Sequence, residues 1–161
     1  MSPRSIMLAT IGAALGSGLI GGVFFAFSSF VMGALGRLAP AGAIRAMQSI
    51  NIVVLNPVFL GVFLGTAVLC LGLAGLSIRA WPPGSSLRIA GCALYLIGTV
   101  GVTLACNVPR NDALAVLTPD GPDAAAAWAR YLAEWTAWNH VRTLAAAASA
   151  VLLVAAQLVR S

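Results

Sequence analysis

The chain has 161 residues, of which 60% are hydrophobic and only 8% are charged, whereas about 25% of the residues in an ordinary soluble domain are charged. Because these few charges cannot cover a water-exposed surface, the composition excludes a soluble globular protein. It indicates that most of the surface faces lipid. All nine basic residues are arginines, and the net charge is +5. They are scattered singly between apolar stretches, a pattern that does not indicate a nucleic-acid partner.

The residues that usually bind cofactors are scarce. Three cysteines, Cys70, Cys92 and Cys106, show no C-x-x-C or zinc-type spacing, so they are interpreted as packing residues. A single histidine and no thiolate pair cannot form a typical metal site within one chain. No glycine-rich phosphate-binding motif is present in the sequence either. We therefore expect no dedicated cofactor.

The first uncharged stretch predicts a transmembrane helix from Met7 to about Leu35, because roughly 20 apolar residues suffice to cross a bilayer. It is longer than the apolar region of about 7 to 15 residues in a cleaved signal, so we expect it to be retained. The second predicted helix runs from Val53 to Ile78. Pro57 is tolerated in its first turn, where its missing N–H would have no helical partner anyway.

A third helix is predicted from about Leu87 to Cys106 and a fourth from Val141 to Val159. The last stretch is short, so we expect its helix to begin earlier, in the alanine-rich segment after Pro122. The expected fold is all-α: one domain over residues 1–161, a four-transmembrane-helix bundle with a polar loop between helices 3 and 4.

Glycines four residues apart lie on one helical face and allow helices to approach closely, although glycine is also simply common in membrane helices. The pairs are Gly12 and Gly16, Gly18 and Gly22, and Gly61 and Gly65.

All four acids fall on one predicted side of the bundle, which favours placing both termini on the cytoplasmic side. We expect an integral protein of the bacterial inner (plasma) membrane.

Polar side chains gather on that same predicted side. Each buried polar group costs free energy unless it is paired, so a shared polar pocket is expected. The alternative is that these residues cap helices and line ordinary loops. They are Gln48, Asn51, Asn56, Asn107, Arg110, Asn111, Asp112, Glu134, Asn139, His140 and Arg142.

One helix face carries most of the aromatic residues of this group. At about 100° per residue, one stripe holds aromatic rings, an amide and a guanidinium. Such a face suits a flat aromatic or quinone-like ligand, although an aromatic belt at the membrane interface would look similar. The stripe contains Trp128, Tyr131, Trp135, Trp138, Asn139 and Arg142.

His140 is the only histidine and therefore a candidate general base. It projects roughly opposite to the stripe, so a kink would be needed to bring it into the same pocket. Glu134, at the edge of the stripe, is a competing base.

Four motifs in this order resemble the anthrone oxygenase-like family of small integral membrane proteins, long described only as a domain of unknown function. The motifs are FFAFSSFVM at residues 24–32, AIRAMQSIN at 43–51 followed by Asn56-Pro57, NVPRN at 107–111, and WNHVRT at 138–143 preceded by Trp128, Tyr131 and Trp135. The resemblance covers nearly the whole chain. It implies a four-helix membrane protein, and some fungal members oxidise polyketide anthrones to anthraquinones with dioxygen and without an obvious cofactor.

The expected function is therefore a membrane-embedded, cofactor-independent oxygenase acting on an electron-rich aromatic substrate with O2, in contact with the lipid bilayer and able to form a homo-oligomer. His140, Glu134, Arg110 and Arg142 are the candidate catalytic residues. The candidate substrate-binding residues are Asn51, Asn56, Asn107, Asn111, Tyr131, Trp135, Trp138 and Asn139.

Two alternatives stay open. One is a non-catalytic membrane module that binds a small apolar molecule or serves as a subunit of a complex. The other is an oxidoreductase that uses a quinone, or a metal held between protomers by His140 from several chains.

Overall fold

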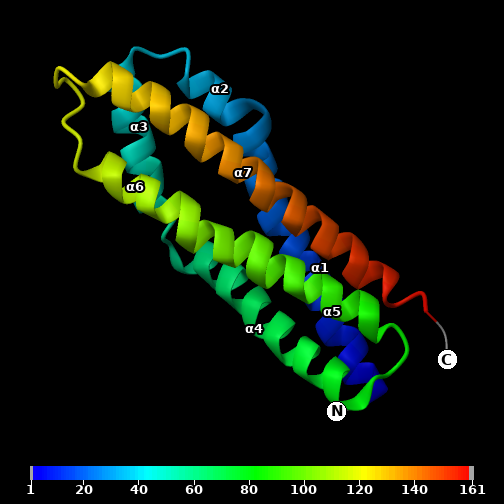
Figure 1. Cartoon of the computed structure of the whole chain (residues 1–161). Helices are drawn as coiled ribbons and strands as arrows, with labels where there is room; N and C mark the ends of the chain where they lie inside the picture. Colours follow the sequence, from blue (N-terminus) through cyan, green and yellow to red (C-terminus); the bar gives the residue numbers. More distant parts are fainter. Residues whose placement is uncertain (1, 160–161) are drawn as a thin grey trace.

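The computed structural model describes residues 2–159, and every regular element within them is a helix. Four long helical segments lie side by side in an elongated bundle (Figure 1). They are Pro3–Leu35, made of α1 (Pro3–Ala26), the π-helical turn η1 (Phe27–Val31) and α2 (Met32–Leu35); α4 (Pro57–Ala80); Ser85–Ala115, made of α5 (Ser85–Ala93), the π-helical turns η2 (Leu94–Gly101) and η3 (Thr103–Asn107) and α6 (Val108–Ala115); and α7 (Ala124–Ala155). A shorter helix, α3 (Pro40–Val53), connects the first two.

Three of these segments are long and apolar enough to cross a membrane, when residues 2–159 are considered: Pro3–Leu35, Pro57–Ala80 and Ser85–Ala115. The all-helical class is thus confirmed, whereas four crossings are not, because α7 falls outside this set. α7 is nevertheless 32 residues long, which at about 1.5 Å per residue exceeds the roughly 30 Å hydrocarbon core of a bilayer. Its polar and charged side chains distinguish it from the other three segments.

The predicted helix ends shift for identifiable local reasons. α4 begins at Pro57 rather than Val53 because Asn56 is its N-cap, accepting the backbone N–H groups of Val58 and Phe59 at 3.1 and 3.0 Å. α7 begins at Ala124, in the alanine-rich stretch after Pro122, which confirms the early start that the sequence predicts.

Two segments that were not predicted as helical form helices. α3 begins at Pro40, in the first turn where proline is tolerated, and buries Ala43, Ile44 and Met47. The predicted polar loop between helices 3 and 4 was wrong in part, because residues 107–115 continue the third segment as helix. Pro109 lies in the first turn of α6 and does not end it.

The bundle has two distinct ends (Figure 1). The beginning of α1, the turn between α4 and α5 and the end of α7 lie at one end; α2, α3, α6 and the beginning of α7 lie at the other. In the α4–α5 turn Gly84 has a φ of +78°, and a Cβ there would overlap the backbone carbonyl of Ala156. Glycine is therefore required at this turn.

The long segments pack closely through small residues. Gly16 packs against Thr66, and a Cβ on Gly98 would lie 2.6 Å from the Cβ of Ala145 on α7. Gly12 is also in the α1–α4 contact, so the first predicted glycine pair packs as expected. The other two predicted pairs, Gly18 with Gly22 and Gly61 with Gly65, face no neighbour within 4 Å.

Candidate functional site

A cavity of about 590 Å³ opens among α1, α3, α4, the third segment and α7. Most of its wall is apolar, with the rings of Phe24, Phe27, Phe59 and Phe63 among the lining side chains. The polar lining residues are few, and they come from three different helical segments: α3, the third segment and α7. These residues are Gln48, Asn51, Thr103, Asn111, Asp112 and Arg142.

Arg142 is the buried charged residue of this wall, in contrast to Asp112, which is exposed. Arg142 is only 5% exposed. Nε donates to Asn139 Oδ1 at 2.9 Å and Nη1 donates to Thr103 Oγ1 at 3.3 Å. The guanidinium carbon lies over two aromatic rings, 3.9 Å from the centroid of Phe24 and 4.9 Å from that of Trp135. All four partners are neutral.

Among the described residues, no carboxylate forms an ion pair with Arg142. The ion pairs formed among residues 2–159 are Arg45 with Asp120 and Arg110 with Glu134, and neither involves Arg142. A buried cation with neutral partners alone is costly. Hydroxyl, amide and aromatic groups reduce that cost without neutralising the charge. The site therefore favours a ligand that places an anionic or strongly accepting oxygen next to the guanidinium.

Asn139 fixes the position of Arg142 and connects two helices. Because Arg142 Nε can only donate, the accepting atom of Asn139 must be its oxygen. Its Nδ2 donates to the backbone oxygen of Phe24 and to Ser28 Oγ, both at 2.7 Å. Every polar atom of this amide is thereby used, so Asn139 positions the site and is not free to bind a ligand.

π-helical turns flank Arg142 on both sides. Ser28 lies in η1, Thr99 in η2 and Thr103 in η3. Thr99 Oγ1 lies 3.5 Å from the backbone oxygen of Arg142, and Thr103 accepts from its side chain. Such wider turns occur frequently at functional sites because they change the direction in which side chains point.

Asn111 supplies a second polar group to the cavity. Its Oδ1 accepts the Tyr131 hydroxyl at 2.9 Å and Trp135 Nε1 at 2.8 Å. Since indole nitrogen only donates, the amide orientation is determined, and Nδ2 is left as a donor to the cavity that Asn111 lines. The rings of Trp128, Tyr131 and Trp135 stack in sequence along α7, with centroids 5.6 and 6.1 Å apart.

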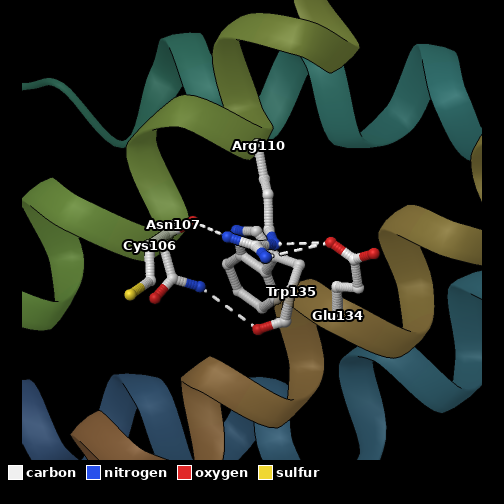
Figure 2. Close-up of polar contacts among 5 residues, drawn as sticks. All are labelled: Cys106, Asn107, Arg110, Glu134 and Trp135. Carbon is white, nitrogen blue, oxygen red and sulfur yellow. Dashed lines mark hydrogen bonds and ion pairs between the residues drawn. The ribbon is translucent and has the colours of Figure 1, made fainter.

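Arg110 and Glu134 lie outside the large cavity. Their ion pair has an N–O distance of 2.9 Å, and Arg110 Nη1 also donates to the backbone oxygen of Cys106 at 2.7 Å (Figure 2). They line a separate pocket of about 280 Å³. Asn107 is fully buried nearby and donates from Nδ2 to the backbone oxygen of Trp135 at 3.2 Å (Figure 2), so it holds η3 to α7.

Other candidates point away from the cavity as well. His140 is exposed on the outer side of α7, as its helical projection predicts. Trp138 is 37% exposed; at 100° per residue it lies at the edge of the aromatic stripe rather than at its centre. Asn56 is used as the α4 cap. The structure thus brings Asn51, Asn111, Trp135 and Arg142 to the cavity wall, with Tyr131 and Asn139 directly behind them.

The sequence analysis placed Gln48 and Asp112 in the expected polar pocket but gave them no role, and it did not include the lining residues Phe24 and Thr103 among the candidate site residues. Thr103 could have been found, because a polar residue in a membrane-spanning stretch commonly faces the interior of the bundle. Within the described part of the chain, no group of three His, Cys, Asp or Glu side chains could hold a metal ion.

The comparisons with known proteins identify the family. A family model described as anthrone oxygenase matches residues 56–152. No match was found among curated proteins or among solved structures. The matched stretch is more than half of the chain and includes Thr103, Asn111, Trp135 and Arg142. The chain belongs to the anthrone oxygenase family.

Proposed function

We propose that this protein is a membrane-embedded oxygenase that binds an electron-rich aromatic compound of the anthrone or phenol type and lets its anion react with dioxygen. The observation that carries the proposal is the buried Arg142 guanidinium, which lines a largely apolar cavity and whose partners among residues 2–159 are neutral. The cavity volume of about 590 Å³ lies within the roughly 300–1,000 Å³ that small-molecule sites occupy. Family membership supports the reaction class.

The two available donors are separated by the Trp135 indole. Arg142 lies over the indole ring, while Asn111 accepts from its Nε1. In an anthrone the carbonyl and the acidic CH2 are at opposite ends of the central ring. A carbonyl oxygen bound by Arg142 therefore directs the CH2 away from the guanidinium. Negative charge that develops on the oxygen during deprotonation is stabilised by a donor that is already in place.

Asp112 is the carboxylate in the cavity wall, and we assign to it the proton acceptor role that the sequence offered to His140 or Glu134. It takes one proton from the CH2, and the resulting carbanion forms a C–O bond with dioxygen, which is the oxidant. Loss of water from the peroxide leaves a new carbonyl. One oxygen atom stays in the product, and the other leaves in water with both CH2 hydrogens.

The test is oxygen uptake by detergent-purified protein with 1,8-dihydroxyanthrone, with and without a chelator. Arg142→Met is compared with Arg88→Met, a matched control: Arg88 is 4% exposed, also has neutral partners, and does not line the cavity. We expect uptake that survives chelation, falls by about 100-fold or more in Arg142→Met, and persists in Arg88→Met. Parent-level uptake in both variants would overturn the proposal.

A second function, binding without turnover, is favoured by one observation. Asp112 is an exposed residue, so the carboxylate to which proton transfer is assigned is not enclosed by the cavity, whereas water is usually excluded from a site of this chemistry. If the protein binds its ligand without turnover, we expect it to bind 1,8-dihydroxyanthraquinone and Arg142→Met to abolish that binding. Oxygen uptake should then not exceed the spontaneous rate. The same purified variants therefore separate the two functions.

For the membrane we propose four crossings in the bacterial inner membrane with both termini cytoplasmic, α7 providing the fourth. The length of α7 and its position alongside α1 over the length of the bundle support this (Figure 1). Reporter fusions at the two termini test it: a phosphatase fusion that is active at either end would contradict this orientation.

A further inference from the structure

We propose that the ligand enters the cavity sideways from the bilayer, between α4 and the third segment, and that it is an amphiphilic aromatic. Its oxygenated ring lies at Arg142 and Asn111, and an alkyl chain remains in the opening toward lipid. This inference rests on the proposed function and specifies its substrate class.

The first observation is that the cavity wall reaches the outer surface. Several residues both line the cavity and have largely exposed apolar side chains: Ile52 and Leu55 at the α3–α4 connection, Leu64 on α4 and Leu104 in η3. Leu64 is 52% exposed and Leu104 is 62% exposed. Both belong to segments long and apolar enough to span a membrane, so the outer side of this wall faces lipid rather than water.

The second observation is the separation of polar and apolar lining. Gln48 and Asn51 come from α3, and Asn111 and Asp112 from α6; α3 and α6 pack together at one end of the bundle (Figure 1). The α4 wall is apolar, and Phe59 and Phe63 on it are stacked with centroids 5.9 Å apart and ring planes 11° apart. These two rings offer aromatic contact area to a planar ring system.

The third observation is the charge. Arg142 can bind an oxyanion, but a ligand without a large apolar part would leave most of the remaining wall uncovered. An amphiphile interacts with both the charged and the apolar part of the wall: its oxygenated head lies at the guanidinium, and its chain lies in the opening formed by leucine and isoleucine side chains. Partitioning into the bilayer also concentrates such a compound at this opening.

The experiment narrows the opening without touching the polar groups. Leu64→Trp and Leu104→Trp add bulk to side chains that line the cavity. Their matched controls are Leu71→Trp on α4 and Ile97→Trp on the third segment, which are 61% and 72% exposed but do not line it. The probes are 1,8-dihydroxyanthraquinone and the same quinone with a dodecyl chain. Binding to protein in phosphatidylcholine vesicles is followed by the visible fluorescence of the quinone.

We expect the two opening variants to slow association by about tenfold or more, and to weaken binding of the dodecyl quinone more than that of the parent quinone. The two controls should behave as the unmodified protein does. If the unmodified protein binds the quinone but all four variants associate at its rate, or are slowed equally, lateral entry is wrong while the proposed function stands. An unmodified protein that does not bind the quinone overturns both.

Discussion

Arg142 donates through Nε to the side-chain oxygen of Asn139, which precedes it by three residues on α7, at 2.9 Å. The amide of Asn139 in turn donates to the Phe24 carbonyl and to Ser28 on the first segment. One side chain thus contributes both to the orientation of the cavity cation and to the contact between two long helices. This arrangement holds the guanidinium in place before any ligand binds, which reduces the cost of ordering it.

Asn139→Ala should therefore reduce stability more than an ordinary polar deletion. It leaves Arg142 Nε without its partner and removes one of the donors to the Phe24 carbonyl, which still accepts the Phe27 backbone N–H. An unsatisfied buried group costs about 1–3 kcal/mol, and more when it is charged. We expect a loss of about 3 kcal/mol or more, measured as a lower unfolding midpoint in detergent. The control is Asn56→Ala, which removes an exposed helix cap worth about 1 kcal/mol. Equal shifts for the two alanine variants would contradict this account of Asn139.

Asn111→Asp separates the two functions of the Asn111 amide. The aspartate keeps an acceptor for Tyr131 and Trp135 but replaces the Nδ2 donor with a second acceptor. We expect an unfolding midpoint near that of the unmodified protein and binding of 1,8-dihydroxyanthraquinone weaker by about tenfold, the equivalent of one hydrogen bond of roughly 1.4 kcal/mol. Quenching of tryptophan fluorescence measures the binding. Unchanged affinity would show that Nδ2 does not contact the ligand.

The choice of base is tested by three variants. Asp112→Asn should reduce oxygen uptake by about 100-fold or more, as expected when a general base is lost. His140→Gln and Glu134→Gln should leave uptake near that of the unmodified protein, because neither side chain lines the cavity. Loss of uptake in His140→Gln with full uptake in Asp112→Asn would reverse the assignment and would require α7 to rearrange.

The sequence predicts well which side chains share one face of a single helix. The 100° spacing places Tyr131, Trp135, Asn139 and Arg142 on one face of α7, and all four residues are buried there. The same spacing directs His140 outward. It does not show that Trp138, at the edge of the stripe, is left partly exposed. How much of a helical edge is covered depends on the neighbouring helices, not on the sequence of the helix itself.

The cavity itself could not be predicted, because its wall combines residues from segments far apart in the sequence. α3 was not predicted because a helix of 14 residues is too short to be recognised as a membrane span. In the structure Gln48 connects α3 to the end of the third segment, since its Nε2 donates to the backbone oxygens of Leu114 and Leu117 at 2.9 and 3.1 Å. Thr103 gains its role because π-helical turns place it against Arg142. Neither π-helical turns nor contacts between segments have a signature in hydropathy.

The last prediction concerns Gly98, where the third segment approaches α7 most closely beside the site. A Cβ at this position would lie 2.6 Å from the Cβ of Ala145, so Gly98→Ala forces the two helices apart, at a cost of about 1–3 kcal/mol. Thr99, the next residue, lies 3.5 Å from the Arg142 backbone oxygen. We therefore expect both a lower unfolding midpoint and a higher KM for the anthrone.

Gly75→Ala on α4 is the matched control for this position, because nothing lies within 4 Å of its Cβ position. The double variant Gly98→Ala with Ala145→Gly removes the clashing methyl group and should recover much of the lost stability and the parent KM. Coupling of this kind is expected only between residues in contact. If the double variant is instead as unstable as the sum of the two single changes, the cost comes from glycine's backbone properties, and close approach of the two helices does not determine the geometry of the site.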